Sequence, residues 1–234
     1  MANEGRIRPL TTPHGIKLSR DSLIRTPGIG SVEARARKEA FGKYFKIELV
    51  QCVTHRPQAE CLDAAIKQYL EKPTDEVKII DCGAGTGLCG VELHKLGYTH
   101  LCALDISPEM LNEARKKNVY QKFICAPLNS DQNPEVNTGE YDAMICFGTL
   151  CAAHVKATAL MEMIRMIKIG GLISFNIRLG EVERYQPMIE ELEKEGKWLN
   201  AAKKTIPHYQ RGDITKTSLS CLQNPEALMR QLTR

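Results

Sequence analysis

Residues 78–87 read Lys78-Ile79-Ile80-Asp81-Cys82-Gly83-Ala84-Gly85-Thr86-Gly87. This stretch begins as an apolar strand and runs into three glycines that alternate with other residues. Glycine adopts backbone conformations that other residues avoid, and its missing Cβ lets a ligand approach the backbone amides. The stretch therefore predicts a site for a nucleotide cofactor at the carboxyl end of a strand.

The acidic residue in this stretch helps to choose the cofactor. The carboxylate of Asp81 would repel a pyrophosphate and attract the ammonium of an amino-acid group. S-adenosylmethionine carries such an ammonium, together with a sulfonium and a ribose. The residues thus favour S-adenosylmethionine, although Gly85–Gly90 also satisfies the dinucleotide pattern GxGxxG and keeps NAD open.

A second carboxylate, Asp105, ends the next apolar segment. From that place it can accept hydrogen bonds from both hydroxyls of a ribose. A hydrogen bond to a charged group is worth roughly 1.5–3 kcal/mol. The alternative is that Asp105 only caps the helix that Pro108 opens, a role that Ser107 can also fill.

The rest of the chain alternates between short apolar runs and segments with helical periodicity. Predicted strands cover 77–81, 100–105, 122–126, 141–147 and 172–177. Predicted helices cover 88–96, a segment from Pro108 to Asn118, 160–167, and a segment from Pro187 to Gly196, with Gly170-Gly171 as a break before the fifth strand. This pattern predicts a doubly wound, Rossmann-like α/β fold, with a mostly parallel sheet and helices on both faces.

The two ends of the chain carry other patterns. Residues 1–30 combine prolines and basic residues without periodicity, which predicts a flexible basic segment. Two alternative roles for residues 1–30 are a lid that folds over the ligand and a contact surface for an acidic partner. Residues 31–234 are predicted to form a single domain, in which helices within 31–72 cover the site. Weaker strand patterns at 198–209 and 217–222 are the last predicted elements of this domain.

Composition narrows the class of protein. A net charge of +4 over 234 residues is too mild to indicate nucleic acid or a membrane surface as partner. Nine cysteines without zinc spacing indicate reduced thiols and no metal site. The sequence has no apolar stretch of transmembrane length and no signal-type segment. We expect a cytoplasmic protein, with entry into the nucleus left open; the oligomeric state is unknown.

Four blocks together resemble class I S-adenosylmethionine-dependent methyltransferases: 81–87, 104–111, Tyr141-Asp142 and Gly170-Gly171-Leu172. The resemblance covers about residues 40–222, and Tyr44, Arg56, Pro57 and the segment 188–198 narrow it to a small subgroup. It implies S-adenosyl-L-methionine as the cofactor. It also implies a seven-stranded sheet with an antiparallel C-terminal hairpin, whose seventh strand lies between the fifth and sixth.

The same resemblance implies where each part of the cofactor binds. The methionyl end would lie on Gly83-Ala84-Gly85, the ribose on Asp105, and the adenine between Ile106 and Leu128. The carbonyl of Phe147 would receive the ammonium. The complete set of expected cofactor residues is Tyr44, Arg56, Asp81, Gly83, Ala84, Gly85, Asp105, Ile106, Met110, Leu128 and Phe147.

Two of these implied roles have alternatives. Arg56 would pair with the methionyl carboxylate and Tyr44 would lie near it; alternatively Tyr44 packs in a helix face and Arg56 is solvated. Many relatives carry an aspartate after the third strand that accepts from the adenine amino group. This chain reads Cys125-Ala126-Pro127-Leu128-Asn129 there, so Asn129 or a backbone amide is expected to replace it.

The methyl acceptor is the least determined part. Methyl transfer mainly requires that donor and acceptor are held in line, and such positioning removes roughly 7–11 kcal/mol from a barrier. Because a dedicated base is optional, no catalytic residue is assigned. Candidates near the strand ends are His55, His154, Asn176, Arg178, Tyr185 and His208. No Asn/Asp-Pro-Pro-Tyr/Phe motif follows the fourth strand. Its absence argues against adenine bases or glutamine amides as methyl acceptors.

A small molecule is therefore the expected acceptor, and protein or RNA acceptors stay open. Two other functions also stay open at this point. One is a non-catalytic S-adenosylmethionine-binding partner or sensor, and the other is an NAD-linked oxidoreductase.

Overall fold

The structure is a computed structural model that describes residues 55–151, 153–210 and 213–223. The predicted segment 1–30, residues 31–54 of the predicted helical region 31–72, and with them Tyr44 lie outside the described residues.

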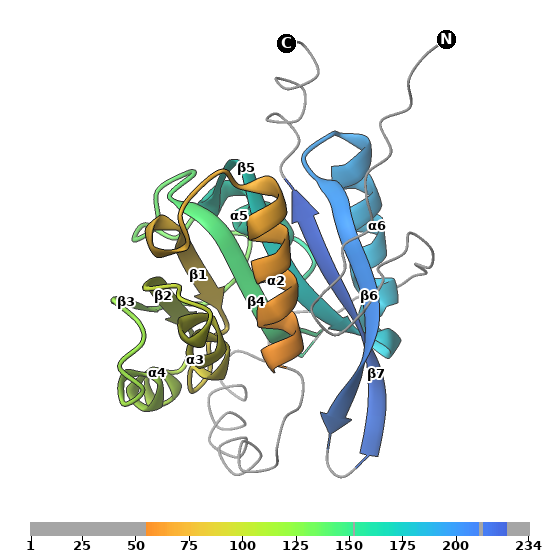
Figure 1. The fold of residues 1–234 in the computed structure, drawn as a ribbon. Coiled ribbons are helices and arrows are strands. Elements are labelled where there is room, and N and C mark those ends of the chain that lie inside the picture. The colour runs from red at the N-terminus through yellow and green to blue at the C-terminus, as the bar shows by residue number, and fades with distance from the viewer. Residues whose placement is uncertain (1–54, 152, 211–212, 224–234) are drawn as a thin grey trace.

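Five parallel strands form the centre of the sheet (Figure 1). They are β1 Lys78–Cys82, β2 His100–Asp105, β3 Lys122–Cys125, β4 Tyr141–Leu150 and β5 Ile167–Arg178. Their order is β3-β2-β1-β4-β5, so the direction of winding reverses between β1 and β4. Ligands of such sheets bind outside the carboxyl ends of the strands at this reversal. The predicted Rossmann-like α/β fold with a parallel core is confirmed.

Two more strands follow at the β5 edge, β6 Leu199–Gln210 and β7 Asp213–Gln223. β7 pairs antiparallel with both β5 and β6, which gives the order β5-β7-β6 at that edge (Figure 1).

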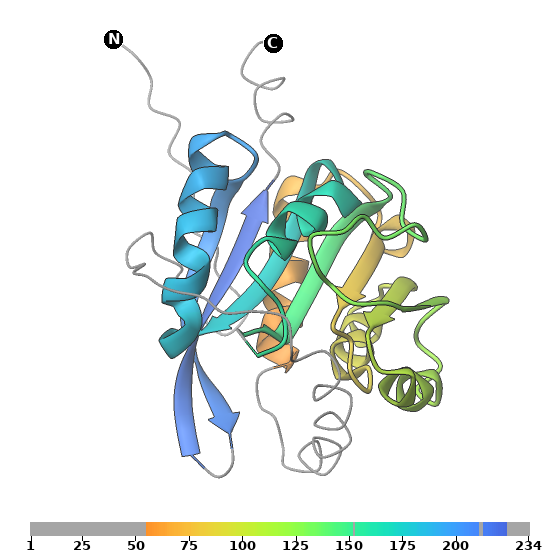
Figure 2. The same cartoon turned by 180° about the vertical axis from the view of Figure 1, so that it is seen from behind.

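Helices cover both faces of the sheet, as Figures 1 and 2 show. They are α2 His55–Tyr69, α3 Leu88–Lys95, α4 Pro108–Arg115, α5 Ala159–Met166 and α6 Val182–Lys194, with short 3-10 turns η1 Thr74–Glu76 and η2 Leu179–Glu181. The apolar sides of α2, α3 and α4 pack with one set of strand side chains, including Ile79. Those of α5 and α6 pack with the alternate set, including Ile80. This alternation follows from the two-residue period of a strand.

Local signals set several helix ends as predicted. The backbone amide of Met110 donates to Ser107 Oγ at 3.2 Å, and Pro108 opens α4. Asn118, beyond the end of α4, has a positive φ of 53°. Gly97 and Gly196 follow α3 and α6 with φ of 97° and 67°, a left-handed conformation that glycine supplies at helix ends.

The predicted break at Gly170-Gly171 was wrong, because both glycines lie inside β5. Ile167 pairs with Tyr141 and Leu172 with Ala143, so the residues between them form an irregularity in the ladder. Gly170 has a φ of 83°, and a Cβ on Gly171 would lie 2.6 Å from the carbonyl oxygen of Asp142. The two glycines therefore allow a bulge that lets the strand continue.

The predicted start of the last helix at Pro187 was also wrong. α6 begins at Val182, and Pro187 lies inside it. Val182 and Tyr185 are buried on the same face as Ile189 and Leu192, so packing against the sheet extends the helix upstream. Proline in a helix interior removes one backbone hydrogen bond, and the burial of this face offsets that loss.

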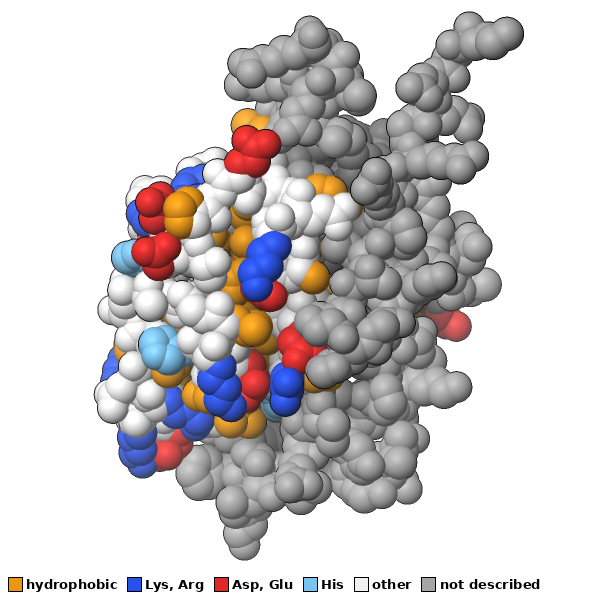
Figure 3. Space-filling view, in the orientation of Figure 1, with side chains coloured by type: hydrophobic (Ala, Val, Ile, Leu, Met, Phe, Trp, Pro, Cys, Tyr) orange, Lys and Arg blue, Asp and Glu red, His pale blue; other side chains and the backbone are white. Residues whose placement is uncertain are grey.

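On the face seen in Figure 3, acidic and basic side chains are interspersed. Ion pairs one helical turn apart include Arg56–Glu60, Lys67–Asp63 and Lys95–Glu92. Exposed pairs of this kind each stabilise a fold by less than about 1 kcal/mol. Within the described residues, none of the helices has the length and apolar character needed to span a membrane.

Candidate active site

The loops that follow β1, β2, β3 and β4 enclose a pocket of about 620 Å³. It lies at the carboxyl ends of the parallel strands, and its size is typical of sites for small organic ligands. Seven expected cofactor residues line it: Gly83, Gly85, Asp105, Ile106, Met110, Leu128 and Phe147. The structure thus brings together side chains and backbone from four separate strand ends.

The glycine turn is fixed to the end of β2. The amides of Gly83 and Ala84 donate to the carbonyl oxygen of Leu104 at 2.7 and 3.1 Å. Gly83 has a φ of 74°, and a Cβ added there would overlap the hydroxyl of Thr149. Glycine is therefore required at this position both by its backbone conformation and by the close approach of β4.

Three carbonyl oxygens converge beside this turn. The hydroxyl of Thr149 lies 3.4 Å from the carbonyl oxygens of Cys82 and Gly83 and 3.2 Å from that of Phe147. A group with several N–H donors matches such a cluster of acceptors, and the ammonium of an amino acid has three. The cluster fits the ammonium of S-adenosylmethionine. Thr149 itself was missed at the sequence level, because its position depends on the absent Cβ of Gly83.

Asp105 is held in place by the backbone. Its Oδ2 accepts the amide of Gly85 at 2.8 Å, and its Oδ1 accepts the amide of Ser107 at 2.9 Å. Burial raises the pKa of Asp105, while these amides and His154 oppose the rise. A carboxylate has about four acceptor positions, so Asp105 retains capacity for two ribose hydroxyls. Because Ser107 supplies the cap of α4, the capping alternative for Asp105 is not needed.

The wall beyond Asp105 is apolar and suits a flat aromatic ring. Ile106 is 47% exposed, unusually open for a large apolar side chain, and it lines the pocket. Met110 and Leu128 line the same pocket and are nearly buried. Burial of Ile106 by an adenine would remove apolar surface from water, at about 25 cal/mol per Å².

Asp81 lies behind the turn, and among the described residues it is not part of the pocket wall. It is 2% exposed, and the hydroxyl of Tyr120 donates to its Oδ2 at 2.6 Å. The same hydroxyl accepts the amide of Gly90 at 3.1 Å. The interaction with Tyr120 joins residues 39 positions apart, and no local pattern predicts it.

Tyr120 also explains two glycines of the GxGxxG pattern. A Cβ on Gly90 would overlap its ring, and one on Gly87 would lie 2.8 Å from its Cε2 atom. These glycines make room for Tyr120, so the pattern has a packing cause that involves no pyrophosphate.

The pH dependence of stability is expected to report on Asp81. Burial raises its pKa from an ordinary value of 3.8 to about 7, although the bond from Tyr120 opposes the rise. Between these values the folded protein keeps a proton that the unfolded chain has lost, so the free energy of unfolding falls as pH rises from about 4 to about 7 and is level above that. Asp81→Asn removes this loss and is expected to be more stable than wild type at pH 8, by on the order of a few kcal/mol.

Denaturant unfolding of both proteins at pH 5 and pH 8 measures this difference. Parallel pH profiles of wild type and Asp81→Asn would contradict a protonated Asp81 in the folded protein.

The remaining expected cofactor residues lie elsewhere. Ala84 is buried within the turn, and Arg56 is exposed on α2, where its Nε lies 2.8 Å from Glu60 Oε1. Within the described part of the chain, neither lines the pocket. Tyr44 lies outside the described residues.

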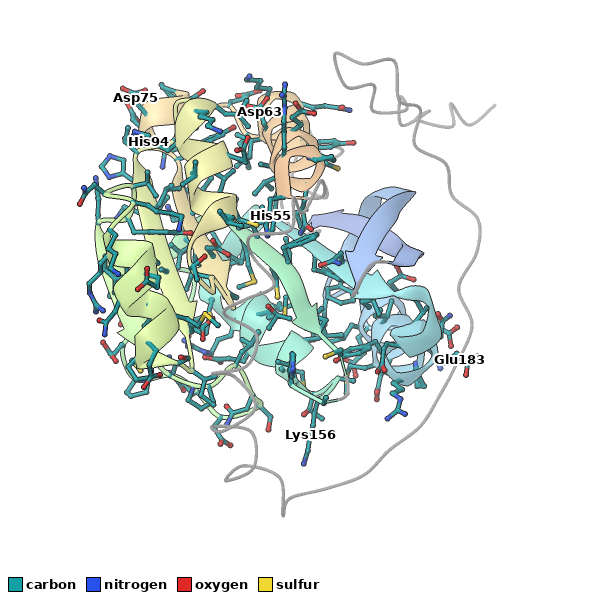
Figure 4. All side chains as sticks on the ribbon, turned by 90° about the horizontal axis from the view of Figure 1, so that it is seen from below. His55, Asp63, Asp75, His94, Lys156 and Glu183 are labelled. Carbon is teal, nitrogen blue, oxygen red and sulfur yellow. The ribbon has the colours of Figure 1, made fainter. Side chains whose placement is uncertain are left out.

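Two histidines named as acceptor-side candidates lie near the pocket. His154 lines it, and the ring of His55 contacts the ring of Phe147 with centroids 4.6 Å apart. Figure 4 looks onto the carboxyl ends of the strands and shows His55 near the centre, whereas Lys156 points outward. His55 is the first residue of α2, whereas His154 lies in the loop between β4 and α5.

Other acceptor-side candidates have structural roles. The hydroxyl of Tyr185 donates to the carbonyl oxygen of Val155 at 2.6 Å, and Asn176 Oδ1 accepts the amide of Gly148 at 2.6 Å. Asn176 thus holds the last residues within β4, and Tyr185 holds the segment that follows β4. The side chains of Arg178 and His208 are outside the described part.

Comparisons with known proteins point to one family. Residues 79–171 match the model of a family described as a methyltransferase domain. Methyltransferase-like protein 27 of Homo sapiens is 30% identical over 138 residues, which are 57% of this chain and 56% of that protein. The chain thus spans about half the length of this curated relative.

Solved structures share the fold. The 1,6-didemethyltoxoflavin-N1-methyltransferase of Burkholderia thailandensis, with bound 1,6-didemethyltoxoflavin and S-adenosylhomocysteine, has a TM-score of 0.56 at 15% identity. The alignment covers 87% of this chain and 94% of that one. A TehB-like S-adenosylmethionine-dependent methyltransferase of Corynebacterium glutamicum has a TM-score of 0.55 at 18% identity, with 81% and 99% covered.

At these identities the similarity to solved structures shows the fold alone. The evidence for a methyltransferase comes from the sequence matches and from the residues of the site. Residues 79–171 match the methyltransferase domain family, and the chain resembles methyltransferase-like protein 27 and shares its fold with S-adenosylmethionine-dependent methyltransferases.

Proposed function

We propose that the protein transfers a methyl group from S-adenosylmethionine to a small-molecule acceptor, by in-line displacement at the sulfonium methyl. The observation that carries this proposal is the single pocket that joins the glycine turn, Asp105 and the carbonyl of Phe147. Bound S-adenosylmethionine supplies an electrophilic methyl group on its sulfonium.

The residues of the chain have three tasks in this proposal. The carbonyls of Cys82, Gly83 and Phe147 hold the ammonium. Asp105 orients the ribose. Ile106 and Leu128 hold the adenine, so the reacting centre is fixed at the end of β4.

The acceptor is proposed to approach along the wall formed by Phe147, Gly148, Thr149 and His154. A pocket of this size suits a small molecule better than a folded macromolecule, and one structural relative binds 1,6-didemethyltoxoflavin. His154 is the pocket-lining imidazole that could accept a proton near neutral pH. Methyl transfer proceeds without a base where the acceptor atom is already a nucleophile.

We also propose that the sheet of the working domain has seven strands with an antiparallel C-terminal hairpin. The pairings of β7 with β5 and β6 support this arrangement. In this arrangement β7 would lie beside β5, the strand that ends near the acceptor side of the pocket.

Incubation with S-adenosylmethionine labelled in its methyl group tests the function. The protein is offered a small-metabolite fraction, a protein fraction and an RNA fraction separately, and the label is followed by mass spectrometry. We expect label in the small-metabolite fraction, formation of S-adenosylhomocysteine, and loss of both in Asp105→Ala. Label in the protein or RNA fraction would overturn the acceptor class. Tight cofactor binding without label in any fraction would favour a non-catalytic sensor.

A further inference from the structure

The end of β4 departs from the regular pairing of the sheet beside the pocket. β4 pairs with β5 at Cys146 and next at Leu150, but the partners of these two residues in β5 stand only two positions apart. Residues 147–149 of β4 therefore lie opposite a single residue of β5, Asn176. Such a bulge changes the direction of the groups at the end of a strand. The inference drawn from it rests on the proposed function, because it concerns how the ammonium of S-adenosylmethionine is held.

The side chain of Asn176 takes the place of a ladder bond in this bulge. Its Oδ1 accepts the backbone amide of Gly148 at 2.6 Å. Asn176 is 3% exposed, and within the described residues it is not part of the pocket wall, whereas Phe147 and Gly148 are. A buried side chain behind the wall thus fixes one peptide group of the wall.

The direction of this peptide group sets the direction of a carbonyl. The group joins Phe147 to Gly148, and in a planar trans peptide the N–H and the C=O point in opposite directions. With the N–H directed at Asn176, the carbonyl of Phe147 is directed away from it. That carbonyl oxygen lies 3.2 Å from the hydroxyl of Thr149, in the cluster of carbonyls that is proposed to hold the ammonium.

A second buried amide holds the two strands where their regular pairing ends. Gln58 of α2 donates through Nε2 to the carbonyl oxygens of Cys146 and Ser174, at 3.3 and 3.2 Å. Gln58 is fully buried, so these bonds are shielded from water. The bulge therefore starts from a fixed pair of strands, and the peptide that Asn176 holds has little freedom to shift as a whole.

We infer that Asn176 is a positioning residue of the cofactor site, which holds the peptide between Phe147 and Gly148 so that the carbonyl of Phe147 faces the ammonium. Asn176 acts through this carbonyl and does not touch the ligand. Without Asn176, the amide of Gly148 can turn to water, because Gly148 is exposed. The carbonyl of Phe147 then turns away from the cluster with it.

Two ligands that differ at one group test this inference. S-adenosylhomocysteine carries the ammonium, and its deaminated analogue carries a hydrogen atom in place of the amino group. Wild-type protein is expected to bind S-adenosylhomocysteine at least about tenfold more tightly, because hydrogen bonds to a charged group are strong. In Asn176→Leu, which keeps a similar shape without an acceptor, this preference is expected to fall to within a few-fold.

Calorimetric titration of full-length variants supplies the two affinities and their ratio. Asn176→Asp keeps an acceptor oxygen for the amide of Gly148, so its ratio is expected to be at least that of wild type. Ser174→Ala is the matched control. Ser174 lies two positions earlier on the same face of β5 and is buried, and within the described residues its hydroxyl has no hydrogen-bond partner. Its ratio is expected to equal that of wild type.

The ratio separates positioning from folding, since a general loss of structure weakens both ligands alike. Asn176→Ala supplies the same comparison if Asn176→Leu does not fold. An unchanged ratio in the variants without an acceptor, with normal binding of S-adenosylhomocysteine, overturns the inference and leaves the proposed function intact. Equal binding of both ligands by wild-type protein overturns it as well. If wild-type protein binds neither ligand, the proposed function fails and the inference falls with it.

Discussion

Asp105→Ala is expected to weaken binding of S-adenosylhomocysteine by about ten- to a hundredfold, the effect of losing hydrogen bonds to a charged acceptor. The carboxylate lines the pocket and is held at a fixed orientation by the amides of Gly85 and Ser107. Its removal also leaves these two amides without their acceptor. A loss of stability is therefore expected beside the loss of affinity.

Asp105→Asn separates the two effects. Its oxygen can still accept one backbone amide, so the loss of stability should be smaller than in Asp105→Ala, while its NH₂ group cannot accept from a ribose hydroxyl. Isothermal titration gives the affinity, and denaturant unfolding gives the stability. Wild-type affinity in both variants would contradict the assignment of the ribose to Asp105.

Gly83→Ala is expected to lower the free energy of unfolding by several kcal/mol and to abolish cofactor binding. The positive φ of Gly83 costs an alanine roughly 1–2 kcal/mol. In addition, the new Cβ would overlap the side chain of Thr149, and overpacking of this kind typically costs about 1–3 kcal/mol. The turn must then move away from β4, which separates the carbonyls proposed to hold the ammonium.

Gly148→Ala is a matched control for this prediction. Gly148 has a φ of 71°, close to that of Gly83, but nothing lies within 4 Å of the position of its Cβ. It should show the backbone cost without the overlap. Denaturant unfolding of both variants measures the difference. Equal losses of stability would show that the side chain of Thr149 moves aside without a loss of free energy.

Features of the fold that depend on neighbouring residues were predictable from the sequence. The strand before the glycines, the cap at Ser107 and the stop at Gly97 each rest on a local backbone preference. The first residues of β5 and α6 were not predictable in this way. The bulge at Gly170 and the burial of Tyr185 depend on contacts with other elements.

The same division applies to the site. Gly83, Asp105 and Ile106 could be placed from the sequence, because each stands at a strand end that parallel topology brings to one edge. Tyr120 and Thr149 could not, since both are defined by the space that a missing Cβ leaves in another element. Once Tyr120 is known, the GxGxxG match no longer favours NAD.

Titration calorimetry of wild-type protein with S-adenosylhomocysteine and with NAD shows whether this pocket binds the methyl donor. We predict saturable binding of S-adenosylhomocysteine at one site and no binding of NAD at the same concentrations. Bound ligand at a hundred times its Kd should also stabilise the fold by about 2.7 kcal/mol. Saturable binding of NAD without binding of S-adenosylhomocysteine would show that the pocket is not a site for S-adenosylmethionine.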